Sequence, residues 1–345
     1  MSAPRGAPAL SVIVPVRNEE RFIRPCIDSI LADAPAGGVE VIVVDGMSDD
    51  RTAEVVAAMA AADPRVRLVS NPSRFVPRAM NLGIETARAP YIGRVDGHSF
   101  VLPGYFPGCL SRLDAGGADC VGGVLIHEGE TRTGRAIAAA MTSPVGVGSA
   151  RFRTGRGGEA FVDTLAFGVY RREVFERIGP FDEAFVRNQD DELNLRLTRA
   201  GGRILLAPSL RLRYVVRGSY RFLARQYFQY GFWKWRVFRK HGRFASARHL
   251  APSAFLLLLG AAALWAITST TGRVALAGLL GVYAAVVATE ALRLRLAGRA
   301  GWGRTFVALV TLHFCYGAGF LAAILDMLAG RGDSGRRASA TGMSR

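Results

Sequence analysis

The chain has 345 residues, of which 50% are hydrophobic, and its formal net charge is +16. This length allows one sizeable domain with an attachment, or two small domains. The four cysteines are scattered without a CxxC pair, which fits a reducing compartment and argues against a disulfide scaffold or a zinc ribbon. Between Glu192 and Glu290 lie fifteen Arg or Lys residues and no acid. A basic block that leads into apolar segments indicates an anionic membrane surface rather than nucleic acid.

The first 240 residues alternate strand and helix signals. SVIVPV (11–16) and VEVIVVD (39–45) are the continuous apolar runs typical of buried parallel strands, and residues 19–34 between them have helical spacing. A series of further elements is expected: a capped helix over 51–62, a strand over 66–70, a helix over 78–87 and a strand over 91–96. This series predicts an α/β fold with a doubly wound, mostly parallel sheet.

Two acids, Asp45 and Asp96, stand at the ends of predicted strands. Ligands of such sheets bind at the carboxyl ends of the strands, so both acids are expected to face one crevice. Neither GxGxxG nor GxxxxGK[ST] follows the first strand, which argues against a dinucleotide-binding dehydrogenase or a P-loop enzyme. Asp96 and His98 offer a carboxylate and an imidazole, which suit Mn²⁺, and Asp96 alone suits Mg²⁺. The alternative is a strand-end turn without metal.

The run NQDDE (188–192) places three acids at the start of a predicted helix. Acids are favoured there by the helix dipole, so helix capping is one interpretation. Three consecutive carboxylates also repel one another, which predicts that one has a raised pKa suited to a base.

Three apolar segments follow, over 250–269, 274–292 and 305–329, each close to the ~20 residues that cross a bilayer. Arginines gather in the loop 293–304, so the positive-inside rule places this loop, and residues 1–249, in the cytoplasm. The lack of a signal peptide in MSAPRGAPAL agrees. We therefore expect a multi-pass protein of the cell inner (plasma) membrane with a cytoplasmic N-terminal domain.

The third apolar segment is the ambiguous one. Three full spans would export the arginines of the tail, 331–345, which is predicted to be disordered. The segment also contains Gly317 and Gly319, so it either crosses fully or is re-entrant.

Five motifs occur together: VPVRNEE (14–20), VVDGMSDDRT (43–52), PRAMNLGI (77–84), RVDGHS (94–99) and NQDDELNLRL (188–197). Their order and spacing resemble the family 2 inverting glycosyltransferases. DGH followed by QDDELNLRL and RQYFQYGFWK (225–234) resembles, within that family, the succinoglycan-type, ExoA-like subgroup. The resemblance covers about residues 10–245 and implies a GT-A fold. We predict a GT-A domain over 1–217, amphipathic interfacial helices over 218–249 and a membrane domain of about three apolar helices over 250–330.

The resemblance also implies residue roles on the donor side. Asp45 would contact the nucleotide base, and Pro15 and Glu19 would line the base and ribose pocket. Arg78 would lie near the diphosphate. Asp96 takes the first position of the DxD metal motif and His98 the third, so the implied cofactor is Mn²⁺ or Mg²⁺.

On the acceptor side, Asp190 matches the family's general base, and Gln189 replaces the usual Glu before it. The aromatic and basic segment 218–248 is either an interfacial helix that also leads an acceptor towards Asp190, or an ordinary packed helix pair. The Arg-Trp pair of processive members is absent. The residues assigned to the acceptor or the interface are Asp191, Gln226, Gln229, Tyr230 and Trp233.

These implications predict an inverting glycosyltransferase that moves a hexose from a nucleotide sugar, with UDP-sugars as the first choice, to a lipid-linked glycan in exopolysaccharide or cell-envelope synthesis. Expected partners are the donor, the lipid-linked acceptor and membrane lipids, with no nucleic acid. Transfer to a bare polyprenyl phosphate is the alternative reaction. A catalytically silent, nucleotide-binding membrane partner is the alternative of another class.

Overall fold

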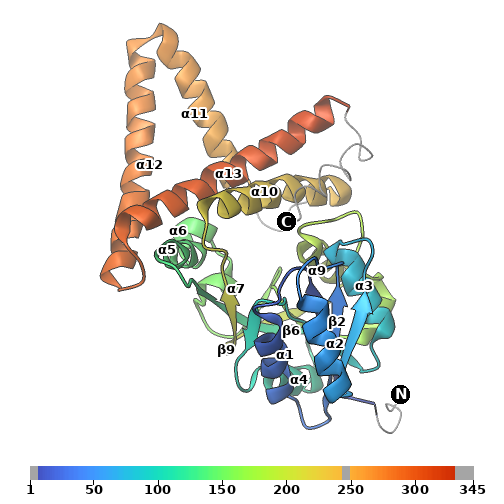
Figure 1. The fold of residues 1–345 in the computed structure, drawn as a ribbon. Helices are drawn as coiled ribbons and strands as arrows, with labels where there is room; N and C mark the ends of the chain where they lie inside the picture. The colour runs from blue at the N-terminus through green and yellow to red at the C-terminus, as the bar shows by residue number, and fades with distance from the viewer. Residues whose placement is uncertain (1–6, 243–248, 331–345) are drawn as a thin grey trace. The chain divides into compact units, whose positions relative to one another are not determined.

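The computed structural model describes residues 7–242 and 249–330 (Figure 1). The predicted disordered tail, 331–345, and residues 243–248 of the predicted interfacial segment lie outside the described residues. The chain forms two compact units. The first comprises residues 7–126 and 155–214, and the second comprises residues 127–154 and the described residues from 215 onward.

The first unit is built on one sheet with the strand order β3-β2-β1-β4-β8-β6-β9-β5, and β7 pairs with β9. The first four of these strands are mutually parallel, whereas β4–β8, β8–β6, β9–β5 and β7–β9 are antiparallel pairs. The strands are β1 (Leu10–Val16), β2 (Val39–Asp45), β3 (Val66–Ser70), β4 (Tyr91–Arg94), β5 (Ser99–Val101), β6 (Cys120–Glu128), β7 (Ala160–Val162), β8 (Val169–Arg171) and β9 (Ile204–Val215). The predicted α/β fold is confirmed, and the antiparallel part of the sheet adds to it.

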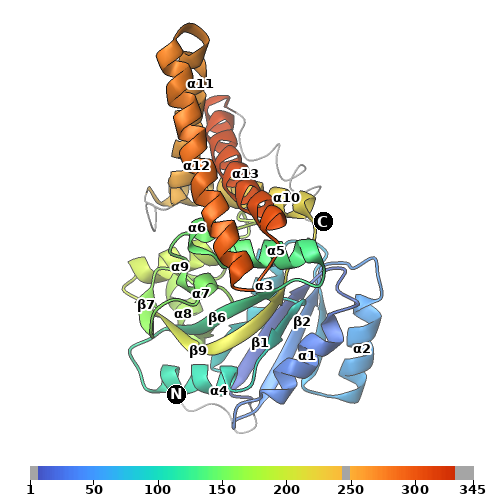
Figure 2. The ribbon, with the colours of Figure 1, turned by 90° about the vertical axis from the view of Figure 1, so that its left-hand side faces the viewer.

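The helices of this unit are α1 (Ile23–Ala32), α2 (Thr52–Ala62), α3 (Val76–Thr86), α4 (Tyr105–Asp114), α8 (Arg172–Ile178) and α9 (Gln189–Arg199). The apolar stripe of α1 (Ile23, Cys26, Ile27 and Ile30) is buried, as its spacing predicts. Figure 2 shows α1 and α2 together on one face of the sheet. The chain then returns from β3 at the edge to β4 beside β1, and right-handed crossovers put α3 on the other face. The point where the chain reverses therefore lies between β1 and β4.

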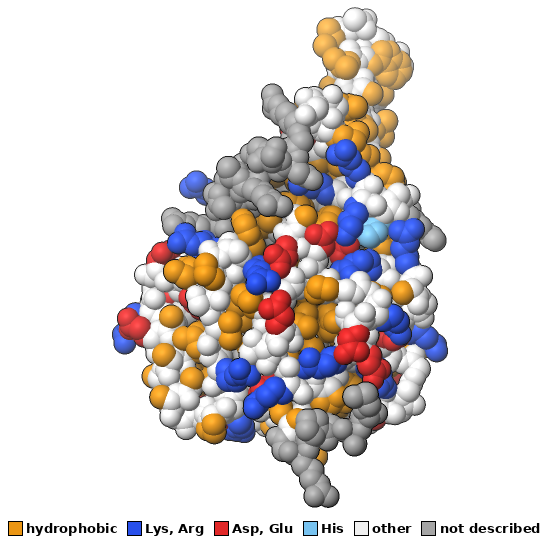
Figure 3. All heavy atoms as spheres, turned by 90° about the vertical axis from the view of Figure 1, so that its right-hand side faces the viewer, with side chains coloured by type: hydrophobic (Ala, Val, Ile, Leu, Met, Phe, Trp, Pro, Cys, Tyr) orange, Lys and Arg blue, Asp and Glu red, His pale blue; other side chains and the backbone are white. Residues whose placement is uncertain are grey.

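The second unit is helical. It contains α5 (Arg132–Met141), α6 (Pro144–Val147), α7 (Arg151–Thr154), α10 (Tyr220–His241), α11 (Ala251–Thr268), α12 (Thr270–Leu296) and α13 (Trp302–Leu328). Helices α11, α12 and α13 are long and apolar enough to cross a membrane, which confirms the three predicted apolar segments and indicates membrane association. In Figure 3 the projecting end of the α11–α12 hairpin shows hydrophobic and uncharged side chains in that view.

Helix α13 runs without interruption through both of its central glycines. A Cβ at Gly319 would lie 2.0 Å from the Phe228 carbonyl oxygen of α10, and one at Gly317 would lie 2.7 Å from the Pro252 oxygen of α11. The glycines therefore permit close helix–helix contact. They do not break the helix, so the described chain shows no re-entrant loop in this segment.

Candidate active site at the carboxyl edge of the sheet

The candidate site lies where the parallel strands end, around the reversal point of the sheet. Asp45 is the last residue of β2 and aligns with Val16, the last residue of β1. Asp96 follows the end of β4 by two residues, on the other side of β1. The two acids thus flank the crevice in which open α/β sheets bind ligands.

Asp45 is held in place by the turn that follows β2. The Ser48 backbone N–H donates to Asp45 Oδ2 at 3.1 Å, and the Ser48 hydroxyl donates to Oδ1 at 2.5 Å. Met47, in the same turn, has a φ of 57°, a left-handed conformation that few non-glycine residues adopt. This turn fixes the orientation of the Asp45 carboxylate, and the residue as a whole is only 7% exposed.

The loop after β4 lies close to the loop after β1. His98 Nδ1 is 2.9 Å from Glu19 Oε1, and the His98 ring packs edge-on against Tyr214 at 4.9 Å between centroids. A Cβ at Gly97 would lie 2.8 Å from Val16 Cγ1. Only glycine at the centre of the Asp-Gly-His motif allows this approach.

Arg94 joins the two acidic motifs. Its guanidinium donates to Asp96 Oδ1 at 2.9 and 3.0 Å and to Asp190 Oδ1 at 2.5 Å. The guanidinium carbon also lies 5.6 Å from the centre of the Phe167 ring. Burial lowers the pKa of Arg94, but the Asp190 and Asp96 carboxylates raise it by more than burial lowers it. The net pKa is therefore raised, and the guanidinium stays protonated. No predicted role fell on Arg94, although a charged residue on a buried strand, two positions before Asp96, was the available signal.

Asp190 is the second residue of α9, and its side chain is 25% exposed. Burial raises the pKa of its carboxyl above the ordinary range, and the nearby Asp96 and Asp191 carboxylates act in the same direction. Arg94 opposes this shift. A carboxylate with a raised pKa and one exposed side suits a general base, as the acidic run predicted.

The neighbours of Asp190 on α9 are anchored to the sheet. Asp191 accepts a hydrogen bond from the Thr164 hydroxyl at 3.0 Å, and Asn194 donates to the same hydroxyl at 3.0 Å. The Tyr170 hydroxyl donates to Asn194 Oδ1 at 2.8 Å. Buried Glu192 pairs with Arg196 one turn along α9. Arg196 also donates to the Gly179 and Pro180 carbonyls at 3.2 and 2.7 Å, which ties α9 to the segment that precedes it.

Two aromatic residues complete the surroundings of Arg94 and His98. Phe167 has a φ of 59° and stacks on Tyr214 at 6.1 Å between ring centres. Strained backbone of this kind is frequent at functional sites. No motif of the sequence pointed to either residue: Phe167 lies in the loop before β8, and Tyr214 lies in β9.

Pro15 lies in β1 opposite Val44 and is half-buried. Arg78 lies on α3, where its guanidinium is 3.3 Å from Glu183 and 3.4 Å from Glu85. The Arg78 side chain is 37% exposed. Its predicted place near a diphosphate stays a prediction.

The remaining predicted residues belong to α10 in the second unit. Gln226 donates to the Tyr230 hydroxyl at 2.9 Å, and Gln229 and Trp233 are buried. Arg236 lies over the Trp233 ring at 4.8 Å. Their predicted roles on the acceptor side or at the membrane interface also stay predictions.

The predicted metal ligands fit a metal ion that substrate helps to bind. Arg94 occupies Oδ1 of Asp96, and among the described residues Oδ2 has no partner. Glu19 engages Nδ1 of His98 and leaves Nε2, an arrangement that orients metal-ligating histidines. No group of three or more His, Cys, Asp or Glu side chains in the described ranges is placed to hold a metal. Proteins usually bind Mg²⁺ beside nucleotides with one or two side chains, and the substrate phosphates supply further ligands.

Comparison with known proteins agrees with this geometry. Residues 11–179 match the model of the family described as Glycosyl transferase family 2. Succinoglycan biosynthesis protein ExoA of Rhizobium meliloti is 30% identical over 318 residues, which cover 91% of this chain and 94% of that protein. This chain belongs to glycosyl transferase family 2. The ExoA-like resemblance is confirmed, and membership brings with it the GT-A fold that the resemblance implied.

Two further relatives are similar to this family 2 glycosyltransferase. The uncharacterized glycosyltransferase EpsJ of Bacillus subtilis is 30% identical, covering 57% of this chain and 58% of that protein. A protein of Methanococcus voltae is 25% identical, covering 72% of this chain and 79% of its own length. Its name is dolichyl N-acetyl-alpha-D-glucosaminyl phosphate 3-beta-D-2,3-diacetamido-2,3-dideoxy-beta-D-glucuronosyltransferase. Both of these proteins are named as glycosyltransferases, which agrees with a glycosyl transfer role for this chain.

Proposed function

We propose that this glycosyltransferase transfers a hexose from a nucleotide sugar, with a UDP-sugar as the first candidate, to a lipid-linked glycan, and that the transfer inverts the anomeric centre. The acceptor hydroxyl gives its proton to Asp190. Its oxygen forms the new bond at the anomeric carbon while the bond to the diphosphate oxygen breaks. The nucleoside diphosphate leaves with that electron pair, from the face opposite the attack.

The observation that carries this proposal is the bridge formed by Arg94. One guanidinium binds both Asp190, the predicted base, and Asp96, the acid predicted to lie at the diphosphate. A sugar whose diphosphate lies at Asp96 would therefore present its anomeric carbon near Asp190. A positioned base typically contributes ~10²–10⁴-fold to such a reaction.

On the donor side, Asp45, held by the turn at Ser48, would contact the nucleotide base, and Pro15 and Glu19 would line the base and ribose pocket. Asp96 Oδ2 and His98 Nε2 are the atoms that would hold Mn²⁺ or Mg²⁺, with Glu19 orienting His98. A divalent ion bound there would offset charge that develops on the departing diphosphate. The Phe167 ring packs against Arg94, and Tyr214 stacks on Phe167.

On the acceptor side, the relatives favour a lipid-linked glycan. The Methanococcus protein is named for a dolichyl-phosphate-linked sugar acceptor, and ExoA is named for succinoglycan biosynthesis. The apolar helices α11, α12 and α13 supply membrane association. An inner-membrane location with the catalytic domain in the cytoplasm completes the proposal.

The test measures sugar transfer by the full chain in membranes, and it compares the Asp190→Asn variant with the Asp63→Asn variant. Asp63 is paired with Arg65 after α2, near the amino end of β3, so it is a charge-matched control away from the site. We expect Asp190→Asn to bind donor normally and to lose transfer by ~10²–10⁴-fold, because only the proton acceptor is removed. Near wild-type turnover in this variant would overturn the assignment of the base.

A screen of radiolabelled UDP- and GDP-sugars, followed by analysis of the labelled lipid, would identify the donor. The anomeric configuration of the product tests inversion directly. Label on a bare polyprenyl phosphate would favour the alternative acceptor. Donor binding without transfer to any membrane acceptor, with Mn²⁺ present, would favour the catalytically silent partner.

A further inference from the structure

Three helices are apolar enough to cross a membrane, but their surroundings in the second unit differ. In the most apolar window of each, 11% of α11 and 17% of α12 are buried inside the chain, against 39% of α13. Helix α11 has 18 residues and is about 27 Å long, close to the roughly 30 Å of a bilayer's hydrocarbon core. Its stacked contact between Phe255 and Tyr283 shows that α11 and α12 pair as an antiparallel hairpin. Almost the whole surface of this hairpin is left for lipid.

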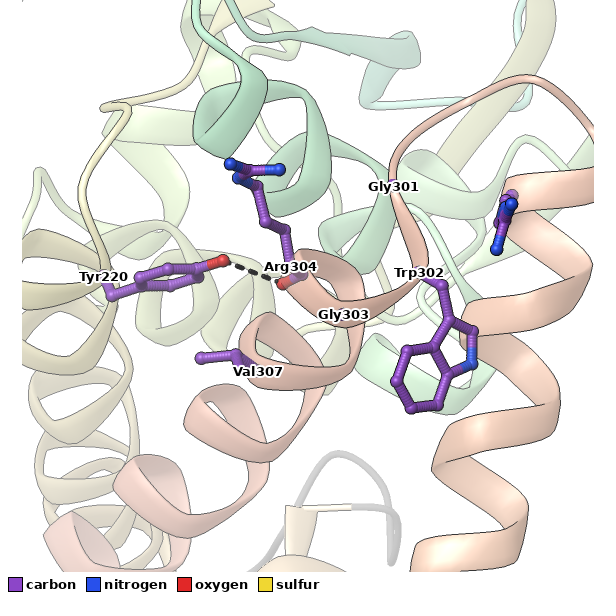
Figure 4. Close-up of a pocket in the computed structure, with 7 residues that line it drawn as sticks. Tyr220, Gly301, Trp302, Gly303, Arg304 and Val307 are labelled. Carbon is purple, nitrogen blue, oxygen red and sulfur yellow. Dashed lines mark hydrogen bonds between the residues drawn. The ribbon is translucent and has the colours of Figure 1, made fainter.

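Helix α13, by contrast, runs beside α10 and in the same direction. The Tyr220 hydroxyl at the start of α10 donates to the Arg304 carbonyl at the start of α13 at 2.9 Å (Figure 4). Further along, a Cβ at Gly231 would lie 1.9 Å from the Tyr316 carbonyl oxygen. The rings of Trp235 and Phe320 then meet at 5.5 Å. The two helices stay in contact over about 24 Å.

Helix α10 cannot lie across a hydrocarbon core. Its 22 residues include six cations and no acid: Arg221, Arg225, Lys234, Arg236, Arg239 and Lys240. Arg and Lys side chains are strongly disfavoured within a bilayer, whereas aromatic rings and cations together are typical of its interface. A helix that follows α10 along this length shares its depth and its orientation.

Helix α13 also contacts the segment from α5 to α6, which lies between β6 and β7 in the sequence. His313 Nε2 is 2.7 Å from the Val145 carbonyl oxygen. A Cβ at Gly146 would lie 3.1 Å from Leu309 Cδ2. If α13 crossed the bilayer, this segment would have to enter it as well, including Arg132 and Arg135 of α5.

The turn from α12 into α13 has the chemistry of a membrane interface. An open cavity of about 720 Å³ there is lined by residues that include Tyr220, Arg295, Trp302 and Arg304. The Trp302 indole N–H donates to the Ala288 carbonyl at 3.1 Å. Tyr and Trp with nearby arginines mark the level of the lipid headgroups.

We propose that only the α11–α12 hairpin crosses the membrane, and that α13 lies in the interface beside α10, on the membrane side that holds the basic loop 293–304. The face of α13 that meets lipid is its exposed stripe of Val307, Ala318 and Leu325. This arrangement keeps the arginines of the tail, 331–345, on the same side as the basic loop 293–304, as the positive-inside rule favours. The proposal rests on contacts within the second unit and is independent of the proposed reaction.

The test uses the full chain with one added cysteine, Thr270→Cys or Ala329→Cys, and a membrane-impermeant maleimide applied to spheroplasts. Both positions are exposed, while three of the four native cysteines are buried and Cys315 is half-buried. The unsubstituted chain is the control for background labelling. We expect Thr270→Cys to be labelled in intact spheroplasts, and Ala329→Cys to be labelled only after permeabilisation.

Labelling of Ala329→Cys in intact spheroplasts would show that α13 crosses and would overturn the proposal. Failure to label Thr270→Cys before permeabilisation, with labelling afterwards, would show that the hairpin does not cross and would overturn it equally. Neither readout requires enzymatic activity, so a failure here is distinct from a failure of the glycosyl-transfer assay.

Discussion

The two units of this glycosyltransferase stabilise their closest contacts by opposite means. In the catalytic unit, Arg94 brings two acids together inside the protein, and each charge is stable there because of its partners. In the helical unit, Gly231 and Gly319 bring backbones together at the α10–α13 contact, where a side chain would not fit. The catalytic edge therefore depends on charge balance, and the contact between the membrane-associated helices depends on shape.

After Asp190 itself, the largest effect is expected at Arg94. Replacing it in Arg94→Met leaves Asp96 and Asp190 without their shared cation, so the base loses its orientation. We expect transfer to fall by at least ~10²-fold, mainly in kcat, with partial recovery in Arg94→Lys. The measurement is the kcat and KM for the donor. Arg65→Met, which removes an exposed partner of Asp63, is the control, and an equal loss in both variants would contradict the role of Arg94.

A smaller effect is expected at the contact between Glu19 and His98. Glu19→Gln keeps the size of the side chain but replaces the carboxylate that orients His98 with a neutral amide. Partners of this kind are worth ~10–100-fold in metal affinity. A titration of transfer against Mn²⁺ should therefore require more metal, with the maximal rate largely retained. An unchanged metal requirement would remove His98 from the predicted ligands.

The helical unit should respond to shape alone. Gly231→Ala places a methyl group 1.9 Å from the Tyr316 carbonyl oxygen, so α10 and α13 must move apart. Overpacking of this kind costs about 1–3 kcal/mol, seen as a lower melting temperature of the solubilised protein. Gly278→Ala on α12, with nothing within 4 Å, is the matched control and should be neutral or slightly stabilising. Equal effects of the two changes would contradict the close helix contact.

The smallest effect concerns pH. Asp190 acts only when ionised, and its pKa is raised, so the transfer rate should increase with pH through a range above that of an ordinary aspartate. The Asp191 charge contributes to this shift. The residual activity of Asp191→Asn should therefore show the same rise at lower pH, measured in single turnovers. A rise at the same pH in both proteins would separate Asp190 from the titration.

The sequence determined much of this protein by local pattern. Apolar runs predicted β1 and β2, and the acids that follow strands predicted the carboxyl edge that holds Asp45 and Asp96. The motifs together predicted the family, and the three apolar segments predicted α11, α12 and α13. Such signals are readable because hydrophobic periodicity and turn residues act over a few neighbouring positions.

The tertiary structure alone decided which distant groups meet. It placed Arg94 between Asp96 and Asp190, and Glu19 against His98, across gaps of 96 and 79 residues. It also set α13 beside α10. Mean hydropathy is alike in the three apolar helices, so hydropathy alone does not decide which of them cross the membrane. These pairings depend on how sheet and helices pack in three dimensions, and no short-range pattern in the chain encodes that packing.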